Sequence, residues 1–315
     1  MASDSGLDSG TGELIALART LGETVDVAVI GERESAAQAI SLGADRVYLL
    51  GGEALVNGGS DAALQAFESV VNETRPGAVL LAKTDAGADL GPRLAARLGT
   101  ALAQDCTSVG LDSDGNLTAT RPVYGGNAVA RVSFGTGQTG LAIVRGKVYE
   151  APEADPSRTG EIIETSPEID PARARVRSIR KVEQAATGIR LEDAAVVVSG
   201  GRGLGGPEPF EQLTELAGLL GGAVGASRAA CDAGWIDHAS QVGLTGKTIT
   251  PELYITVGIS GASQHMAGCS GSKNIVAINS DDSANIFKDS RYGVVGDWKA
   301  VLPAFLATVR ELRND

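Results

Sequence analysis

The sequence has few cysteines, histidines and aromatic residues, and each shortage argues against a class of site. Three cysteines occur, Cys106, Cys231 and Cys269, and no Cys-x-x-Cys pair is formed. We therefore expect no structural zinc, no iron–sulphur cluster and no disulfide framework. The two histidines, His238 and His265, have no carboxylate at ligand spacing, so we expect no metal site. Aromatic residues make up 4% of the chain, too few for a platform that stacks nucleic-acid bases.

The sequence also lacks an excess of basic residues and a long apolar run. The formal net charge is -12, which makes nucleic acid and anionic membrane surfaces poor partners. No uninterrupted apolar span is long enough to cross a bilayer, and the first residues resemble neither a signal peptide nor a basic transit segment. We expect no nucleic-acid partner, no membrane insertion and a reducing, cytoplasmic setting.

Glycine is abundant, at 42 of 315 residues, and glycine-rich polar clusters gather between residues 200 and 297. The clusters span residues 200–206, 225–230, 241–247 and 258–265. Residues 194–199 form a β-branched run that fits a strand buried on both faces, and residues 210–220 have the apolar spacing of a helix. This part of the chain therefore indicates a strand, a glycine-rich turn and a helix.

The polar clusters follow predicted strands, so they should converge on one edge of a sheet. One strand leads to Ser227 and Arg228, and the strand at residues 253–257 leads to the cluster at 258–265. In open parallel sheets, ligands bind beyond the carboxyl ends of the strands. The sequence therefore predicts a doubly wound α/β domain with one binding crevice at this edge.

Residues 12–150 alternate between helical and extended patterns and predict another α/β domain, nucleotide-binding-like in layout, with a mostly parallel sheet. The predicted helices span residues 14–21, 36–42, 61–74 and 89–98, and the predicted strands span residues 25–30, 47–50 and 78–82. Strands at residues 117–121, 128–134 and 139–144 follow short links and predict an appended antiparallel section. We expect residues 151–173 to be an exposed excursion and residues 175–179 to form one more strand.

Two features concern the limits of the domains. We place the boundary near residues 183–188, so that the domains span residues 1–187 and 188–315. The first regular element is a helix, although a doubly wound domain normally opens with a strand. Either the chain from Met1 begins downstream of such a strand, or the sheet is completed in another way.

Two familiar glycine motifs occur in incomplete form. Residues 201–206 match Gly-x-Gly-x-x-Gly, but residues 227–228 are serine and arginine where a dinucleotide fold needs an acidic residue for the ribose. Residues 243–248 resemble the end of a phosphate-binding loop, but Gln241 replaces its first glycine and Pro251 blocks the helix that should follow. A standard NAD site is therefore disfavoured, and we reject an ATPase.

Several polar side chains have a structural interpretation beside a functional one. Arg228 could be an ordinary solvated arginine, but its glycine- and alanine-rich surroundings favour a buried or half-buried role. We expect His238 to be structural, and His265 gains interest only from its polar neighbours. Asp297 could cap the last helix and Asn279 could close a strand. No Ser/His/Asp, Cys/His or paired-carboxylate arrangement stands out, which argues against acyl transfer and hydrolysis.

Short segments of the second domain follow one another at specific spacings. They are Gly-Gly-Arg-Gly (200–203), Ala-Val-Gly-Ala-Ser-Arg-Ala-Ala (223–230), Asp-Ala-Gly (232–234), Gln-Val-Gly-Leu-Thr-Gly-Lys (241–247), Pro-Glu-Leu-Tyr-Ile (251–255), Gly-Ile-Ser-Gly-Ala-Ser-Gln-His (258–265), Val-Ala-Ile-Asn (276–279) and Tyr-Gly-Val-Val-Gly-Asp (292–297). Together they resemble the alpha subunit of electron-transfer flavoproteins over nearly all of residues 190–312. The first domain resembles the same family more loosely, through residues 92–97, 124–127 and 144–146.

That resemblance implies a heterodimer of alpha and beta subunits, with beta contacting the first domain and FAD held mainly by the second. The chain would be an electron carrier with no substrate chemistry of its own. It would take electrons from flavin dehydrogenases such as acyl-CoA dehydrogenases, as in fatty acid beta-oxidation, and pass them to a quinone oxidoreductase. The residues that the resemblance implies at FAD are Arg202, Ser227, Arg228, Val242, Gly243, Leu244, Thr245, Ser260, Gly261, Ala262, Ser263, Gln264, His265, Asn279, Asp297 and Trp298.

Within that set the resemblance implies specific roles. Arg228 would stand beside the isoalloxazine ring, Thr245 would place its hydroxyl near N5, and His265 would lie near the C2 carbonyl. Fixed donors and cations there would stabilise the charge of a reduced ring. Leu244 stands where many relatives have glutamine, and no cysteine-rich extension is present, so we expect no added iron–sulphur domain.

Three other functions remain to be separated from this one. A bifurcating, NADH-dependent carrier would keep a second flavin mostly on the beta subunit, so the deciding residues lie on the partner, as does the choice between AMP and FAD there. An adenine-nucleotide-binding or nucleotide-hydrolysing α/β protein would explain the glycine-rich turns, but not residues 227–228 together with 258–261. A structural subunit that has lost its cofactor is opposed by Arg228, Thr245 and His265.

Overall fold

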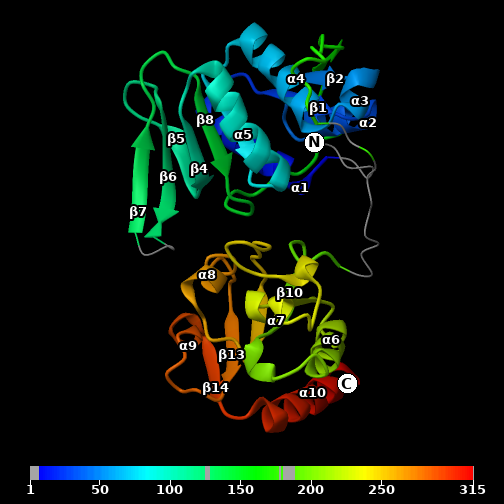
Figure 1. Ribbon diagram of the computed structural model, residues 1–315, viewed down its shortest axis with the longest axis vertical. Coiled ribbons are helices and arrows are strands. Elements are labelled where there is room, and N and C mark those ends of the chain that lie inside the picture. Colours follow the sequence, from blue (N-terminus) through cyan, green and yellow to red (C-terminus); the bar gives the residue numbers. More distant parts are fainter. Residues whose placement is uncertain (1–6, 125–127, 177–178, 180–188, 315) are drawn as a thin grey trace. The chain divides into compact units, whose positions relative to one another are not determined.

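The computed structural model describes residues 7–124, 128–176, 179 and 189–314, and it contains two compact α/β units (Figure 1). The first unit is Met1–Val182 and the second is Glu183–Asp315. The predicted boundary between residues 187 and 188 lies outside the described residues, as do residues 125–127 of the predicted Tyr124 motif and the start of the chain.

From residue 189 to residue 314, the second unit forms one five-stranded parallel sheet with the order β11-β10-β12-β13-β14. This confirms the predicted doubly wound architecture, because the chain starts in the interior of the sheet and extends it in both directions. The strands are β10 (Val196–Gly200), β11 (Ala223–Ala226), β12 (Leu253–Val257), β13 (Ile275–Asn279) and β14 (Tyr292–Val295). The helices are η2 (Arg202–Leu204), α6 (Pro209–Leu219), α7 (Arg228–Asp232), η3 (His238–Ser240), α8 (Ser263–Met266), α9 (Ile286–Asp289) and α10 (Trp298–Asn314).

Both faces of this sheet are covered, which explains its near-continuous apolar strands. Val198 and Ile255 belong to a buried cluster with α6 and α10, whereas their neighbours Val197 and Tyr254 belong to a second cluster on the other face. Successive side chains of a strand point to opposite faces, so a strand covered on both sides needs an unbroken apolar run. The run at residues 196–198 therefore had to be a central strand.

The described residues of the first unit form three three-stranded sheets. Two are parallel, with the orders β1-β2-β9 and β3-β8-β4, and the third, β5-β6-β7, is antiparallel. The strands are β1 (Asp26–Ile30), β2 (Arg46–Leu50), β3 (Ala78–Ala82), β4 (Leu102–Cys106), β5 (Ser108–Leu111), β6 (Leu117–Val123), β7 (Ala128–Ser133), β8 (Gly140–Val144) and β9 (Glu161–Thr165). The helices are α1 (Ser9–Leu21), α2 (Arg33–Ser41), α3 (Glu53–Asn57), α4 (Gly59–Thr74) and α5 (Asp85–Leu98).

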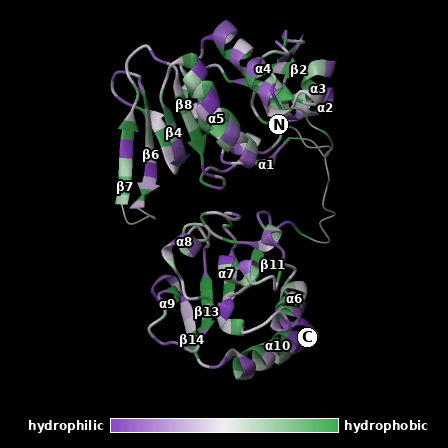
Figure 2. Cartoon of the chain, in the orientation of Figure 1, coloured by the Kyte–Doolittle hydropathy of each residue, from purple (hydrophilic) through white to green (hydrophobic). Residues whose placement is uncertain are grey.

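The antiparallel section was predicted correctly for β6 and β7 but wrongly for β8. The β8 strand is buried along its whole length and pairs in parallel with β3 and β4. Such a fully buried, unbroken apolar strand is typical of a parallel sheet. In contrast, no residue of β7 is buried, and Figure 2 shows both hydrophilic and hydrophobic residues along β7, whereas β13 of the second unit is mostly hydrophobic.

Two further expectations for the first unit need correction. Residues 151–173 are mostly exposed, as expected, but they contain β9, which pairs in parallel with β2. The predicted strand at residues 175–179 is absent from its described residues, because the backbone N–H groups of Arg175 and Val176 donate to Asp61 Oδ2 at 2.7 and 3.0 Å. Among the described helices, none is long and apolar enough to span a membrane.

Candidate functional site

The strand order of the second unit places a crevice between β10 and β12. Counted along the chain, the order is 2-1-3-4-5, so the sheet changes its winding direction between the first and the third strand. Connections leave such neighbouring strands toward opposite faces, and ligands bind beyond their carboxyl ends. We call this end of the sheet the carboxyl edge; it carries the segments that follow the five strands, beginning at residues 201, 227, 258, 280 and 296.

The loops after β10 and β12 are in backbone contact at the carboxyl edge. The Gly201 N–H donates to Val257 O at 2.9 Å, and the Gly203 N–H donates to Gly258 O at 3.1 Å. A Cβ atom on Gly201 would lie 2.1 Å from Gly258 O, so a larger residue would separate the loops. Glycine is therefore needed here for the approach of one loop to another, and between these contacts Arg202 presents an exposed side chain.

The segment after β11 carries Ser227 and Arg228. The Ser227 N–H donates to Gly200 O at 3.0 Å, while its buried hydroxyl has no partner within the described part of the chain. Arg228 opens α7, and its Nε atom lies 3.2 Å from Asp232 Oδ2, one helical turn later. Its side chain is 67% exposed in this chain. The expectation that Arg228 is buried or half-buried is therefore wrong for the chain by itself. A first-turn position on the outer side of α7 explains the difference.

The loop at residues 241–247 lies against α8. The Leu244 N–H donates to Gln264 O at 2.7 Å, and Gly243, at φ 144°, would place a Cβ atom 3.0 Å from the same oxygen. The Leu244 side chain and Thr245 are exposed. The Thr245 hydroxyl accepts a hydrogen bond from Gln241 Nε2 at 3.0 Å, which fixes where that hydroxyl lies.

His265 is the buried titratable group of the site. Its Nε2 atom lies 2.8 Å from the Tyr254 hydroxyl, and the two rings stack with centroids 6.1 Å apart. Its Nδ1 atom is buried and reaches no partner of the described chain in hydrogen-bonding geometry. Burial lowers the pKa of His265 to about 4, although the nearby backbone of the buried residue Val242 opposes the shift. The imidazole is therefore neutral at pH 7.

The loop that leads from β12 into α8 presents several polar groups to solvent. Ser260, Ala262, Ser263 and Gln264 are exposed, whereas Gly261 is buried at φ 76°. A Cβ atom on Gly261 would lie 2.2 Å from Ile286 N, so the left-handed turn and the close packing both require glycine. This turn keeps the exposed polar residues on the carboxyl edge.

The last predicted residues lie on β13 and at the start of α10. The Asn279 Nδ2 donates to Ile259 O at 2.9 Å, and the Trp298 indole N–H donates to Gly203 O at 3.2 Å. Asp297 Oδ1 accepts from the Lys299 N–H at 3.0 Å, so the capping role expected for Asp297 is confirmed.

Hydrogen bonds thus join the segments after all five strands into one layer. Within the described chain, this layer contains two buried polar atoms without partners, Ser227 Oγ and His265 Nδ1. Buried polar atoms in proteins are normally paired, so these two fit a ligand that supplies hydrogen-bonding groups. The described residues contain no group of His, Cys, Asp and Glu that could hold a metal ion. The layer therefore fits an organic ligand better than a metal.

Two partners of the predicted residues were not found from the sequence, Tyr254 and Gln241. Both lie next to residues that were predicted, and both fix a predicted side chain by a hydrogen bond. A tyrosine within a buried strand is a usable signal, because its hydroxyl needs a partner. The rejected phosphate-binding loop is indeed followed by a strand, β12, rather than by a helix.

Comparison with known proteins points to one family along both units. Residues 2–170 match the electron transfer flavoprotein domain, and residues 190–270 match the electron transfer flavoprotein FAD-binding domain. The chain is 42% identical to an electron transfer flavoprotein subunit alpha of Megasphaera elsdenii, over 96% of this chain and 91% of the relative. It is also 42% identical to the protein of that name from Bacillus subtilis, over 98% and 95%. A protein FixB of Azorhizobium caulinodans is 39% identical, over 88% and 76%.

Proposed function

Because this chain belongs to the electron-transfer flavoprotein alpha subunits, a family of electron carriers rather than enzymes, we propose that it binds FAD at the carboxyl edge of its second unit. The observation that carries this proposal is the meeting of five strand-end segments around two buried polar atoms without described partners, Ser227 Oγ and His265 Nδ1. FAD would supply reversible electron transfer at its isoalloxazine ring.

The chain's own residues would bind the cofactor and set its electrostatic surroundings. Arg228 would contribute a permanent positive charge, Thr245 a hydroxyl oriented by Gln241, and His265 a neutral imidazole held by Tyr254. The remaining holding residues are Arg202, Ser227, Val242, Gly243, Leu244, Ser260, Gly261, Ala262, Ser263, Gln264, Asn279, Asp297 and Trp298.

The partners form a second part of the proposal. The relatives' name, subunit alpha, supports a beta subunit as partner of this chain, in a heterodimer. We propose that flavin dehydrogenases such as acyl-CoA dehydrogenases donate the electrons and that a quinone oxidoreductase accepts them, in the cytoplasm and during fatty acid beta-oxidation.

Flavin content and reduction test the proposal directly. The chain, co-expressed with its genomic neighbour, should carry one FAD per heterodimer and should be reduced stepwise under anaerobic conditions. If the protein carries a second FAD and NADH reduces it, the result would favour a bifurcating carrier over a simple one. A protein without flavin that binds or hydrolyses adenine nucleotides would contradict the proposal.

Substitution of Arg228 by alanine should lower the reduction potential of the bound flavin and leave much of the FAD in place. A unit charge at about 4 Å contributes about 1 to 4 kcal/mol between effective dielectric constants of about 80 and 20. At about 59 mV per 1.4 kcal/mol for one electron, the expected fall is on the order of 40 to 170 mV, measured by redox titration.

Arg291→Ala is the matched control for this substitution. Arg291 is also exposed, and its Nη1 donates to Asn274 Oδ1 at 2.8 Å, where both residues precede strands at the opposite end of the sheet. If the reduction potential of the bound flavin is the same in Arg228→Ala and in the unchanged protein, Arg228 does not set that potential, whatever the control shows.

A further inference from the structure

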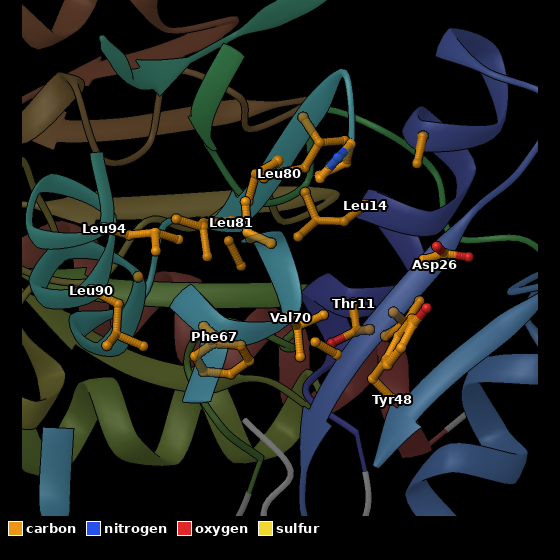
Figure 3. Close-up of a pocket in the computed structure, with 18 of the residues that line it drawn as sticks. Thr11, Leu14, Asp26, Tyr48, Phe67, Val70, Leu80, Leu81, Leu90 and Leu94 are labelled. Atoms are coloured by element: carbon orange, nitrogen blue, oxygen red, sulfur yellow. The ribbon is translucent and has the colours of Figure 1, made fainter. Parts of the chain in front are cut away.

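An apolar cavity lies between β1 and β3 of the first unit (Figure 3). It has a volume of about 270 Å³ and is lined mostly by apolar side chains, among them Phe67 and Leu94. Asp26, which also lines it, is paired with Arg46 at 2.7 Å. Side chains that could select a ligand by the direction of their hydrogen bonds lie instead in the second unit, where a series of such bonds ends at Thr245.

His238, Gln241 and Thr245 form this series, which we call the glutamine relay. The His238 Nδ1 atom lies 3.2 Å from Gln241 Oε1, and Gln241 Nε2 donates to the Thr245 hydroxyl at 3.0 Å. The backbone fixes the spacing of the first two residues, because the Gln241 N–H donates to His238 O at 3.0 Å. Gln241 is 5% exposed, whereas His238 and Thr245 are exposed. A buried amide with a partner at each polar atom is held in one orientation.

The orientation of the Gln241 amide determines which atoms of the glutamine relay donate. Its oxygen faces His238, and an amide oxygen only accepts, so the proton lies on His238 Nδ1. The other ring nitrogen has a more distant neighbour, because His238 Nε2 lies 4.0 Å from Asp232 Oδ1, beyond hydrogen-bond distance. The Asp232 carboxylate also faces Arg228, whose Nε atom lies 3.2 Å from Oδ2. His238 is therefore the donor at this end of the relay.

The other end of the amide leaves the Thr245 proton available to a ligand. The NH₂ group of Gln241 only donates, so the Thr245 oxygen accepts there and its own proton points elsewhere. Thr245 is exposed at the carboxyl edge. If the amide were turned over, its oxygen would take the Thr245 proton, and the hydroxyl would offer a ligand only lone pairs. The orientation of one amide thus decides whether Thr245 donates or accepts.

We propose that His238 and Gln241 are positioning residues that hold Thr245 as a hydrogen-bond donor to the ligand. This role rests on the proposed function, because Thr245 is one of the residues proposed at FAD. It gives His238 a part beyond the structural one expected from the sequence. It also specifies the chemistry at this point of the site, since the ligand atom that faces Thr245 has to be an acceptor, such as a ring nitrogen with a lone pair or a carbonyl oxygen.

FAD titration of the co-expressed protein, after its flavin has been removed, tests the role of Gln241. In Gln241→Glu the carboxylate only accepts and takes the Thr245 proton, so the dissociation constant for FAD should rise about three- to tenfold. Thr245→Val removes the hydroxyl and should raise the constant by a similar factor. In the Thr245→Val protein, Gln241→Glu should then have little further effect, which separates the loss of the donor from the added charge.

A pair of variants at the exposed end of the glutamine relay tests the role of His238. His238→Leu removes the donor to Gln241 Oε1 and frees the amide to turn over, so the dissociation constant for FAD should rise about twofold or more. His238→Gln keeps an N–H donor at this position. It should restore a dissociation constant close to that of the unchanged protein.

The outcomes separate this role from a merely structural one. Weaker binding that depends on Thr245, with recovery in His238→Gln, supports the proposal. Equal dissociation constants in the unchanged protein, Gln241→Glu and His238→Leu overturn it, and so does a loss from Gln241→Glu that is undiminished in the Thr245→Val protein. Urea midpoints show whether each variant is folded, and the surface variant His238→Leu decides the test if Gln241→Glu does not fold. If the unchanged protein binds no FAD, the proposed function itself fails, and this role fails with it.

Discussion

At the scale of single residues, His265 should make the second unit sensitive to acid. Its folded-state pKa is about 4, below its ordinary value of 6.5, because the imidazole is buried. Unfolding therefore takes up a proton between these values, and the stabilisation that is present above pH 6.5 is lost as the pH falls toward 4. The shift corresponds to on the order of 3 kcal/mol. Urea titrations at several pH values measure the free energy of unfolding. As the pH is lowered from 6.5 to 4, this free energy should fall less steeply in His265→Gln than in the unchanged protein.

The other histidine provides the control for this prediction. His238 has a side chain that is 64% exposed and lies 3.2 Å from Gln241 Oε1. His238→Gln should retain the full acid sensitivity of the unchanged protein. If His265→Gln and the unchanged protein lose stability in parallel between pH 6.5 and 4, burial of His265 is not the cause.

At the scale of elements, the contact between the loops after β10 and β12 should depend on Gly201. Alanine there would bring a methyl group against the Gly258 carbonyl, 2.1 Å away, so the backbone must move. We expect Gly201→Ala to lower the free energy of unfolding by about 1 to 3 kcal/mol and to weaken FAD binding. Urea unfolding and flavin titration measure the two effects.

Gly218→Ala is the matched control, because it adds the same methyl group to a glycine that is exposed in α6. Apart from its chain neighbours and the backbone of its own helix, no heavy atom lies within 4 Å of its Cβ position. In a helix, alanine is favoured over glycine by up to about 1 kcal/mol, so stability should be unchanged or slightly higher. Equal losses in the two variants would mean that the loop contact does not determine the effect of Gly201→Ala.

At the scale of the whole molecule, the tryptophans report on one unit alone. The chain has two, Trp235 and Trp298, and both lie in the second unit. Since FAD is proposed to bind that unit, FAD at 100 times its dissociation constant should add about 2.7 kcal/mol to its stability. The urea midpoint detected by tryptophan fluorescence, with each curve normalised to its own baselines, should rise with FAD. An unchanged midpoint at saturating FAD would place the cofactor elsewhere.

The elements that the sequence predicted well are those whose signal is local. Apolar runs such as residues 196–198 and helical stripes such as that of α1 lie within one segment of chain, and the polar clusters follow the strands directly. The pairing of strands could not be predicted in this way. The pairing of β8 with β3, or of β9 with β2, joins segments that are far apart along the chain, and nothing in either segment specifies its neighbour.

The sequence by itself therefore determined the family, the doubly wound second unit and the set of residues proposed for FAD, because order and spacing along the chain carry that information. The tertiary structure alone decided that Tyr254 holds His265, that Arg228 is exposed in this chain, and that β1 and β3 border a gap. Those three properties depend on distances between atoms that are remote along the chain, and such distances exist only once the sheets and their covering helices have packed.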